Sequence, residues 1–192
     1  MRNKLKSFIY ILFCFFLLSK SISANEPFTF NVTEIEILKN GNQINGYKGG
    51  TAISEDGSTI TAENFFYNKL TNILEAIGNV KYIDESRNTI ITTDKAIYLK
   101  NEEKVFTTGS SKAENENNII TAENLEYDKI NNLFKAKKNA VIEDFEKNSL
   151  IYADEITYLK SEEKVFTTGK TKALIEDKYT FYSENVSYLR EI

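Results

Sequence analysis

The apolar residues of this chain recur in a pattern of about thirty positions. Each copy begins with an apolar residue and has further apolar residues five and seven positions later. A small or β-branched residue stands two positions after the start, usually followed by an acidic one. The six copies begin at Phe30, Ile60, Ile91, Ile120, Ile151 and Phe181. Their residues seven positions later are Ile37, Tyr67, Tyr98, Tyr127, Tyr158 and Tyr188.

A longer period of sixty residues contains two of these copies. Residues 98–109 return as residues 158–169 with a single substitution, serine at position 161 in place of asparagine at position 101. Residues 121–124 likewise repeat residues 61–64. Repeats of this length are typical of proteins built from stacked, structurally equivalent units.

Alternation within each copy predicts a β-strand that bends in its middle. Ile60 and Ala62 follow a two-residue period, and so do Phe65 and Tyr67, but the two pairs are out of step by one position. A shift of one residue turns a side chain to the opposite face of a strand unless a bulge or bend absorbs it. We therefore predict a corner at Glu63–Asn64 and its equivalents, with all four apolar side chains facing the interior.

A polar turn and a return strand complete each unit. Residues 100–104 form one such turn, in which we expect Glu103 to be exposed, and residues 74–82 and 105–109 alternate again as return strands. Small residues at the middle of these strands are expected to leave room inside the unit. They are Ala76, Gly78, Ala136 and Gly169. A sustained helical period is absent and Pro27 is the single proline, so we expect almost no helix.

Each unit is thus a bent antiparallel hairpin that cannot bury its apolar face alone. Stacked copies bury this face along a continuous core. The predicted fold class is therefore all-β, an elongated and twisted stack of V-shaped hairpins over residues 28–190. The sixth copy stops at Ile192 without its return strand, which leaves an edge able to pair with another chain. We expect end-to-end association through residues 179–189 and an N-terminal strand near residues 28–37.

The first 24 residues predict a cleaved export signal. Three basic residues among the first six precede an unbroken apolar run over residues 8–18, and small residues lead to Ala24. A membrane-spanning helix needs about 20 apolar residues, so we expect cleavage after Ala24 and one mature domain of residues 25–192. The single cysteine, Cys14, lies within the signal, which leaves the mature chain without a thiol.

Charge and composition narrow the class of function. Removal of the signal takes away four basic residues and no acidic ones, so the net charge changes from −4 to −8. An acidic chain of this kind is a poor partner for nucleic acid. The sequence contains no histidine, the commonest general base and the commonest metal ligand. We therefore predict a binding protein rather than an enzyme, without catalytic residues, metal site or cofactor.

The repeats resemble the OstA-like family, the periplasmic β-jellyroll domains of the lipopolysaccharide transport (Lpt) system. The sequence ITAENFFY at residues 60–67 and the sequence AIGNV at residues 76–80 carry the resemblance, and residues 120–127 are the next best copy. It extends over residues 28–188. Each motif is short and degenerate, so its specificity comes from serial repetition behind an export signal.

This resemblance implies a hydrophobic groove along an OstA-like β-jellyroll, in which the acyl chains of lipid A slide. It also implies a periplasmic protein that carries lipopolysaccharide toward the outer membrane and associates with the inner or outer membrane through partners. Those partners would be other OstA-like Lpt domains, joined head to tail by β-strand addition, or copies of this chain. The interior residues expected to contact lipid are Ile60, Ala62, Phe65, Tyr67, Leu74, Ala76, Val80, Ile120, Ala122, Leu125, Tyr127 and Phe134.

Family members with this domain are a soluble bridge, a protein anchored to the inner membrane, and a protein that carries it ahead of an outer-membrane barrel. The cleavable signal disfavours the anchored form, and the other two stay open. A structural surface protein or adhesin built as a β-solenoid is the alternative from another class. That alternative predicts a solid interior without a lipid-sized cavity.

Three repeated or clustered features have a functional and a structural interpretation. The acidic residues at the corners are either a catalytic or calcium-binding array or simple side-chain caps. The tyrosines are either a sugar-stacking ladder or part of the core with their hydroxyls at its rim. The pair Lys137–Lys138 meets either a lipid A phosphate or solvent in a turn. In each case the structural interpretation is favoured.

Overall fold

The structure is a computed structural model that describes residues 26–176 and 178–189. The predicted export signal, residues 1–24, lies outside these residues, so its cleavage stays a prediction. Within the described part of the chain, no helix is both long and apolar enough to cross a membrane.

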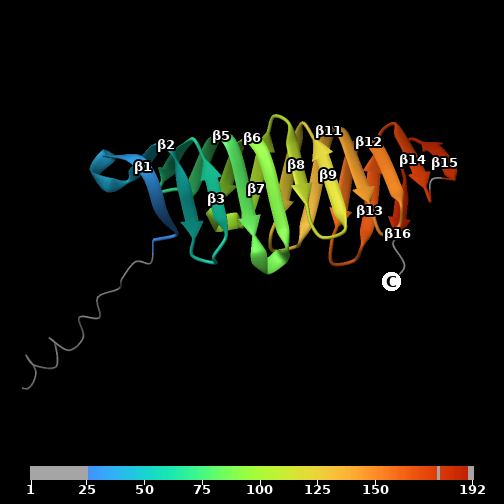
Figure 1. The fold of residues 1–192 in the computed structure, drawn as a ribbon, viewed down its shortest axis with the longest axis horizontal. Helices are drawn as coiled ribbons and strands as arrows, with labels where there is room; N and C mark the ends of the chain where they lie inside the picture. Colours follow the sequence, from blue (N-terminus) through green and yellow to red (C-terminus); the bar gives the residue numbers. More distant parts are fainter. Residues whose placement is uncertain (1–25, 177, 190–192) are drawn as a thin grey trace, which may run out of the picture.

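The described residues form sixteen strands in one antiparallel sheet, which builds an elongated body (Figure 1). The strands are β1 (Phe28–Leu38), β2 (Gln43–Ser54), β3 (Thr59–Ala62), β4 (Asn64–Asn68), β5 (Ile73–Asp84), β6 (Thr89–Leu99), β7 (Lys104–Thr108), β8 (Ser111–Glu114), β9 (Asn118–Ala122), β10 (Asn124–Asp128), β11 (Leu133–Asp144), β12 (Ser149–Leu159), β13 (Lys164–Thr168), β14 (Thr171–Ile175), β15 (Tyr179–Ser183) and β16 (Ser187–Leu189). Three short 3-10 turns, η1 (Lys39–Gly41), η2 (Glu85–Arg87) and η3 (Lys100–Glu102), connect consecutive strands.

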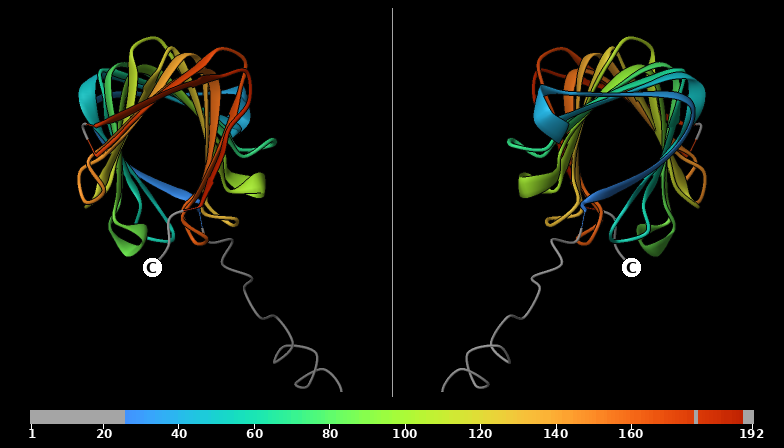
Figure 2. Two further views of the ribbon diagram at one scale, coloured as in Figure 1. Left: turned by 90° about the vertical axis from the view of Figure 1, so that its right-hand side faces the viewer. Right: turned by 90° about the vertical axis from the view of Figure 1, so that its left-hand side faces the viewer.

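The sheet bends along its middle into two arms. The first arm contains β3, β8, β9, β14 and β15, and the second contains β4, β7, β10, β13 and β16. The long strands β1, β2, β5, β6, β11 and β12 run through both arms. For example, β5 pairs with β3 through Tyr82 opposite Ile60 and with β4 through Leu74 opposite Tyr67. Figure 2, which looks along the body, shows the two arms around a common interior.

The predicted corner is confirmed. Glu63 separates β3 from β4, and the flanking Ala62 and Phe65 are both buried, with 4% and 0% of their surface exposed. The long strands bend at the same level, because the register of β5 against β6 shifts between Ile77 and Val80. The two-residue period therefore slips at the corner without turning either apolar face outward.

Glycines at the corner do not leave room inside the units, so that prediction is wrong for Gly78 and Gly169. Gly78 has a φ of +84°, and a Cβ atom there would lie 2.4 Å from Oε2 of Glu63. Asn79 continues the left-handed bend with a φ of +47° and donates from Nδ2 to Oε1 of Glu63 at 2.6 Å. Gly109 and Gly169 meet Asp94 and Asp154 in the same way. The repeated acidic residues are thus side-chain caps that close the corners.

Substitution of a corner glycine is expected to reveal this close approach. Gly109→Ala should destabilise the fold by more than the roughly 1–2 kcal/mol that a left-handed conformation costs a residue with a Cβ atom, because the new atom meets Asp94. Gly57→Ala is the matched control, since Gly57 has the same φ of +86° with nothing within 4 Å. Urea unfolding measures both. Equal losses in the two variants would show that the contact with Asp94 contributes nothing.

The core runs the length of the body and lies between the arms. Aromatic rings form a continuous row through it, with neighbouring ring centroids 4.5–6.3 Å apart. The row consists of Phe30, Phe28, Phe65, Tyr67, Tyr98, Tyr82, Tyr127 and Phe134. The tyrosines of the central repeats are therefore core residues, as the structural interpretation expected.

Candidate functional site

The twelve residues predicted to contact lipid all lie in this core, each between 0% and 8% exposed. They come from both arms, since Ile60 and Ala62 lie on β3 whereas Phe65 and Tyr67 lie on β4. The group around residues 60–80 and the group around residues 120–134 meet through Tyr82, whose ring lies 6.2 Å from that of Tyr127. The sequence pattern thus identified one continuous apolar surface between the arms.

Protein side chains fill this apolar interior. Tyr127 stacks on Phe134 at 4.5 Å, and Leu74 and Phe65 have no exposed surface. The cavity that enters the interior near β16, between Ile151 and Val165, holds only about 10 Å³. Within the described residues, room for an added apolar chain at this cavity would therefore require these side chains to move apart.

The free ends of the arms face each other opposite the corner, and we call this line the mouth. Its first-arm side is formed by the turns at residues 55–58, 85–88 and 115–117, and its second-arm side by those at 100–103, 129–132 and 160–163. Strand pairs lie within each arm and continue around the corner, so the described contacts across the mouth are made by turns and side chains.

Lys129 is the principal contact across the mouth. Its side chain is 1% exposed and its ammonium forms ion pairs with Asp56 of the first arm and, at 2.9 Å, with Glu103 of the second. It also donates hydrogen bonds to the Tyr98 hydroxyl at 2.7 Å and to Ser58 Oγ at 3.2 Å. From the first arm, Arg87 Nε donates to the backbone oxygen of Lys129 at 3.2 Å.

Burial and hydrogen bonds shift the pKa values of Asp56, Glu103 and Tyr98 in this cluster. Burial raises the pKa of Asp56, but hydrogen bonds from Lys129 and Ser58 outweigh it, so the pKa lies well below its usual value. Burial also raises the pKa of Glu103, and hydrogen bonds from Lys100, Tyr98 and Lys129 lower it by more. Desolvation raises the pKa of Tyr98, supported by its hydrogen bond to Glu103. The cluster thus holds an ammonium, two carboxylates and a neutral phenol.

Sequence reasoning missed this cluster. It placed Glu103 in an exposed turn, but that side chain is 25% exposed and bridges Lys129 and Tyr98, so the expectation was wrong. The position of Lys129 in the repeat does not predict its burial. Lys69 occupies the same position and lies at the surface, where it pairs with Glu26 at 2.8 Å. Partners of Lys129 lie up to 73 residues away in the chain.

Comparison with known proteins supports the same fold. No curated protein matches the chain. Among solved structures, it is similar to LptH from Pseudomonas aeruginosa, the LptA-homologous periplasmic component of the conserved lipopolysaccharide transport device. The TM-score is 0.53 at 13% identity, over 59% of this chain and 83% of that chain. This similarity confirms the predicted β-jellyroll. The sequence model of OstA-like proteins matches residues 29–184, and the chain therefore belongs to the OstA-like protein family.

Proposed function

We propose that this protein is an exported periplasmic carrier that binds lipopolysaccharide by its acyl chains between the two arms. The observation that carries the proposal is the continuous apolar core from Phe28 to Ala173, enclosed by arms that polar side chains join at the mouth. Burial contributes about 0.8 kcal/mol for each methylene group, so several acyl chains would bind firmly without a charged contact. Membership of the OstA-like family and the fold shared with LptH support this cargo.

Lipid enters through the mouth in this proposal. Opening there breaks the contacts of Lys129 and Lys160, the hydrogen bond from Arg87 and that from Asn118 to Tyr158, while the strand ladders and the capped corners stay intact. The apolar side chains of both arms then face the acyl chains instead of each other. Contacts with the acyl chains then replace those between the arms and offset the cost of opening, while removal of the chains from water provides the affinity.

Lipid capture in cells tests the proposal. Photocrosslinking residues placed at Tyr67, Leu74 and Tyr127 should each capture lipopolysaccharide, because these side chains face the interior. Glu102 is the control position, since it is exposed in the adjacent turn. Capture at Glu102 without capture at the three interior positions would refute binding between the arms. It would favour the structural β-solenoid alternative, with which the filled interior agrees.

Both ends of the body support head-to-tail pairing with like domains. Ile35 and Ile37 on β1 are 51% and 63% exposed, and at the other end Tyr179, Phe181 and Tyr182 on β15 are 58%, 55% and 76% exposed. Figure 1 shows these strands at opposite ends of the body. Unpaired edges with exposed apolar side chains are suited to β-strand addition by another OstA-like Lpt domain or a copy of this chain.

Charge on the terminal edge is expected to abolish self-association. The mature protein should form larger species as its concentration rises, whereas the Phe181→Lys, Tyr182→Lys variant should remain monomeric, because a charge on an edge strand opposes pairing. Sedimentation velocity over a concentration series measures this. Phe145→Lys is the control, since Phe145 is 49% exposed in a turn away from both ends. Growth of the edge variant at the wild-type rate would exclude this edge as the interface.

A further inference from the structure

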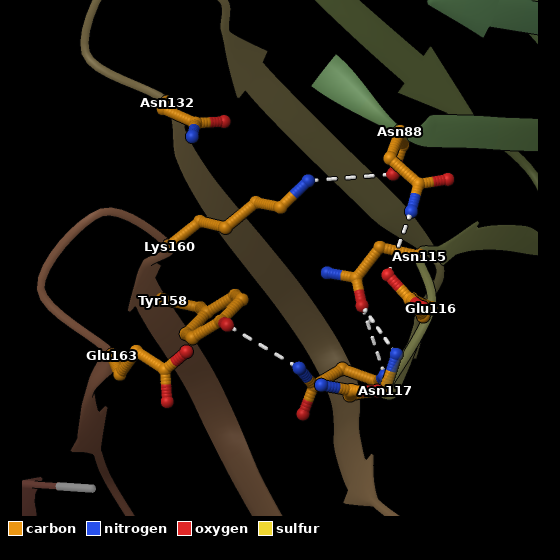
Figure 3. A pocket seen from close by; sticks show the side chains of 9 residues that line it. Asn88, Asn115, Glu116, Asn117, Asn132, Tyr158, Lys160 and Glu163 are labelled. Atoms are coloured by element: carbon orange, nitrogen blue, oxygen red, sulfur yellow. Dashed lines mark hydrogen bonds between the residues drawn. The ribbon is translucent and has the colours of Figure 1, made fainter. Parts of the chain in front are cut away.

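A polar cavity of about 310 Å³ lies at the mouth between the arms, and neither the family nor the predicted lipid contacts account for it. Its first-arm wall is formed by Asn88 and the β8–β9 turn. Its second-arm wall is formed by Asn132, Tyr158, Lys160 and Glu163 (Figure 3). In all, five asparagines, two glutamates, one tyrosine and one lysine line it. The volume is at the lower end of that of small-molecule sites, which hold roughly 300–1,000 Å³.

The sixty-residue repeat shows what is unusual about Asn132. Its counterpart Asn72 is fully engaged, since Oδ1 accepts from the Tyr67 hydroxyl at 2.8 Å and Nδ2 donates to Asn101 at 2.9 Å. Asn132 Oδ1 is buried as well, but it accepts no hydrogen bond from any described residue. The residue that corresponds to Asn101 is Ser161, the one substitution between the two copies of residues 98–109. A buried amide oxygen without a donor is unfavourable, and a ligand hydroxyl that reaches it would satisfy it.

Among the described residues, Lys160 also lacks the side-chain partner that its counterpart, Lys100, has in the other copy. Lys100 forms an ion pair with Glu103. The Lys160 ammonium instead donates to the backbone oxygen of Arg87 and to that of Asn88 at 3.3 Å, and within the described part of the chain it forms no ion pair. Burial lowers the pKa of Lys160, partly offset by the charge of Asp84. The cavity therefore contains a cation that is held by neutral oxygen atoms.

The side chains that line the cavity favour a ligand with hydroxyl groups over one with phosphate. Amide side chains both donate and accept hydrogen bonds, as sugar hydroxyls do. A phosphate is disfavoured, because Glu116 and Glu163 outnumber the single lysine and give the lining a net charge of −1. Figure 3 shows the Asn115 side chain on the wall that faces Tyr158 and Lys160, so polar groups converge from both arms.

The cavity also continues toward the apolar interior. Tyr158 and Asn118 line both this cavity and the narrow one between Ile151 and Val165, and Asn118 Nδ2 donates to the Tyr158 hydroxyl at 3.3 Å where the two meet. A ligand with a sugar head and acyl chains would place its head at the mouth and its chains below. We propose that this cavity is a saccharide site that binds the uncharged, hydroxyl-bearing part of a glycolipid head group. Only the position of the acyl chains in this proposal rests on the proposed carrier function.

Titration of the mature protein with an N-acetylated glucosamine disaccharide, which carries no charge, no long acyl chain and no phosphate, tests the site. Backbone NMR signals of Asn115, Asn117, Asn118 and Asn132 should shift on addition of the sugar. Asn132→Gly should weaken binding at least tenfold, because glycine retains the left-handed backbone at a φ of +50° but removes the amide. Asn72→Gly is the matched control in the other copy of the repeat, at a φ of +54°.

Ser161→Asn is a second variant that adds an atom group instead of removing one. It restores the amide oxygen that accepts from Asn72 Nδ2 in the other copy, so it should hold the Asn132 side chain through Nδ2 and weaken sugar binding to a similar degree without loss of stability. Unchanged sugar affinity in both Asn132→Gly and Ser161→Asn would overturn the saccharide site. So would inorganic phosphate shifting these signals when the sugar does not.

A sugar-free fatty acid, titrated in parallel, separates this site from the proposed function. Fatty acid that binds the interior equally in the wild type and Asn132→Gly, together with a sugar that shifts no signal, would overturn the saccharide site and leave the acyl-chain carrier standing. Sugar binding at the mouth with no fatty acid bound between the arms would support the saccharide site and reject the carrier.

Discussion

Replacement of Lys129 by methionine is expected to lower the free energy of unfolding by about 3 kcal/mol. Removal of one partner from a buried ion pair typically costs about 3–5 kcal/mol, since the other charge remains without compensation. The lower end applies here, because the Asp56 and Glu103 side chains keep 33% and 25% of their surface exposed. Methionine retains the length and the apolar stem of lysine, so the loss reports the ammonium rather than a cavity.

The difference between the two proteins should shrink in acid. Because the pKa of Asp56 and that of Glu103 are lowered in the folded state, their contribution to stability is present above the unfolded values of about 4 and is lost as the pH falls below them. The wild type should therefore begin to lose this contribution below about pH 5 and lose more of it until the pH falls through the lowered pKa values of the folded state, whereas the variant has already lost it. Urea unfolding at pH 7 and pH 3 measures the effect.

Lys69→Met is the matched control for this prediction. Lys69 occupies the same position of the preceding sixty-residue repeat, but it is 30% exposed and pairs with Glu26 at the surface. An exposed ion pair contributes about 0.2–1 kcal/mol, so the loss should be small and nearly independent of pH. A Lys129→Met variant as stable as Lys69→Met at pH 7 would show that the mouth is not held by this ammonium.

Local pattern was sufficient to predict the fold and the core. The two-residue period of Ile60 and Ala62, and its slip before Phe65, report directly on which face each side chain occupies, and the structure buries all three. The repeats strengthened this prediction, because every unit packs on its neighbours in the same way and therefore has apolar residues at the same positions. The interior surface was therefore accessible from sequence alone.

Contacts across the mouth could not be predicted in this way. Lys129 and Lys69 occupy equivalent positions in similar segments of the repeat, and only the closing of the arms brings Asp56 to the first and leaves the second at the surface. The unpaired oxygen of Asn132 was hidden as well, because Tyr127 stands where Tyr67 donates to Asn72 in the other copy, yet its hydroxyl gives Asn132 no hydrogen bond. The role of Gly78 was misread for a related reason, since its neighbour Glu63 is distant in sequence, at the corner between β3 and β4.

A cross-link that ties the two arms together at the mouth is expected to abolish lipid loading. Cysteines introduced at Asp56 and Lys129, whose side chains meet across the mouth, can be joined by a short reducible bifunctional thiol reagent. The only cysteine of the sequence, Cys14, lies in the predicted export signal, so the predicted mature chain of residues 25–192 contains no competing thiol. If acyl chains enter only where the arms separate, the cross-linked protein should bind no lipopolysaccharide, and reduction should restore binding.

The double-cysteine protein before cross-linking is the first control, because it lacks the ion pair but leaves the mouth free to open. A cross-link within one arm, between cysteines at Thr121 of β9 and Lys112 of β8, is the second, since these opposed residues do not move apart in the proposed opening. Lipid already bound when the mouth is closed should be retained, which separates blocked entry from a damaged interior. Normal loading of the protein tied between Asp56 and Lys129 would mean that lipid reaches the core from an end of the body, and the mouth would then have no part in entry.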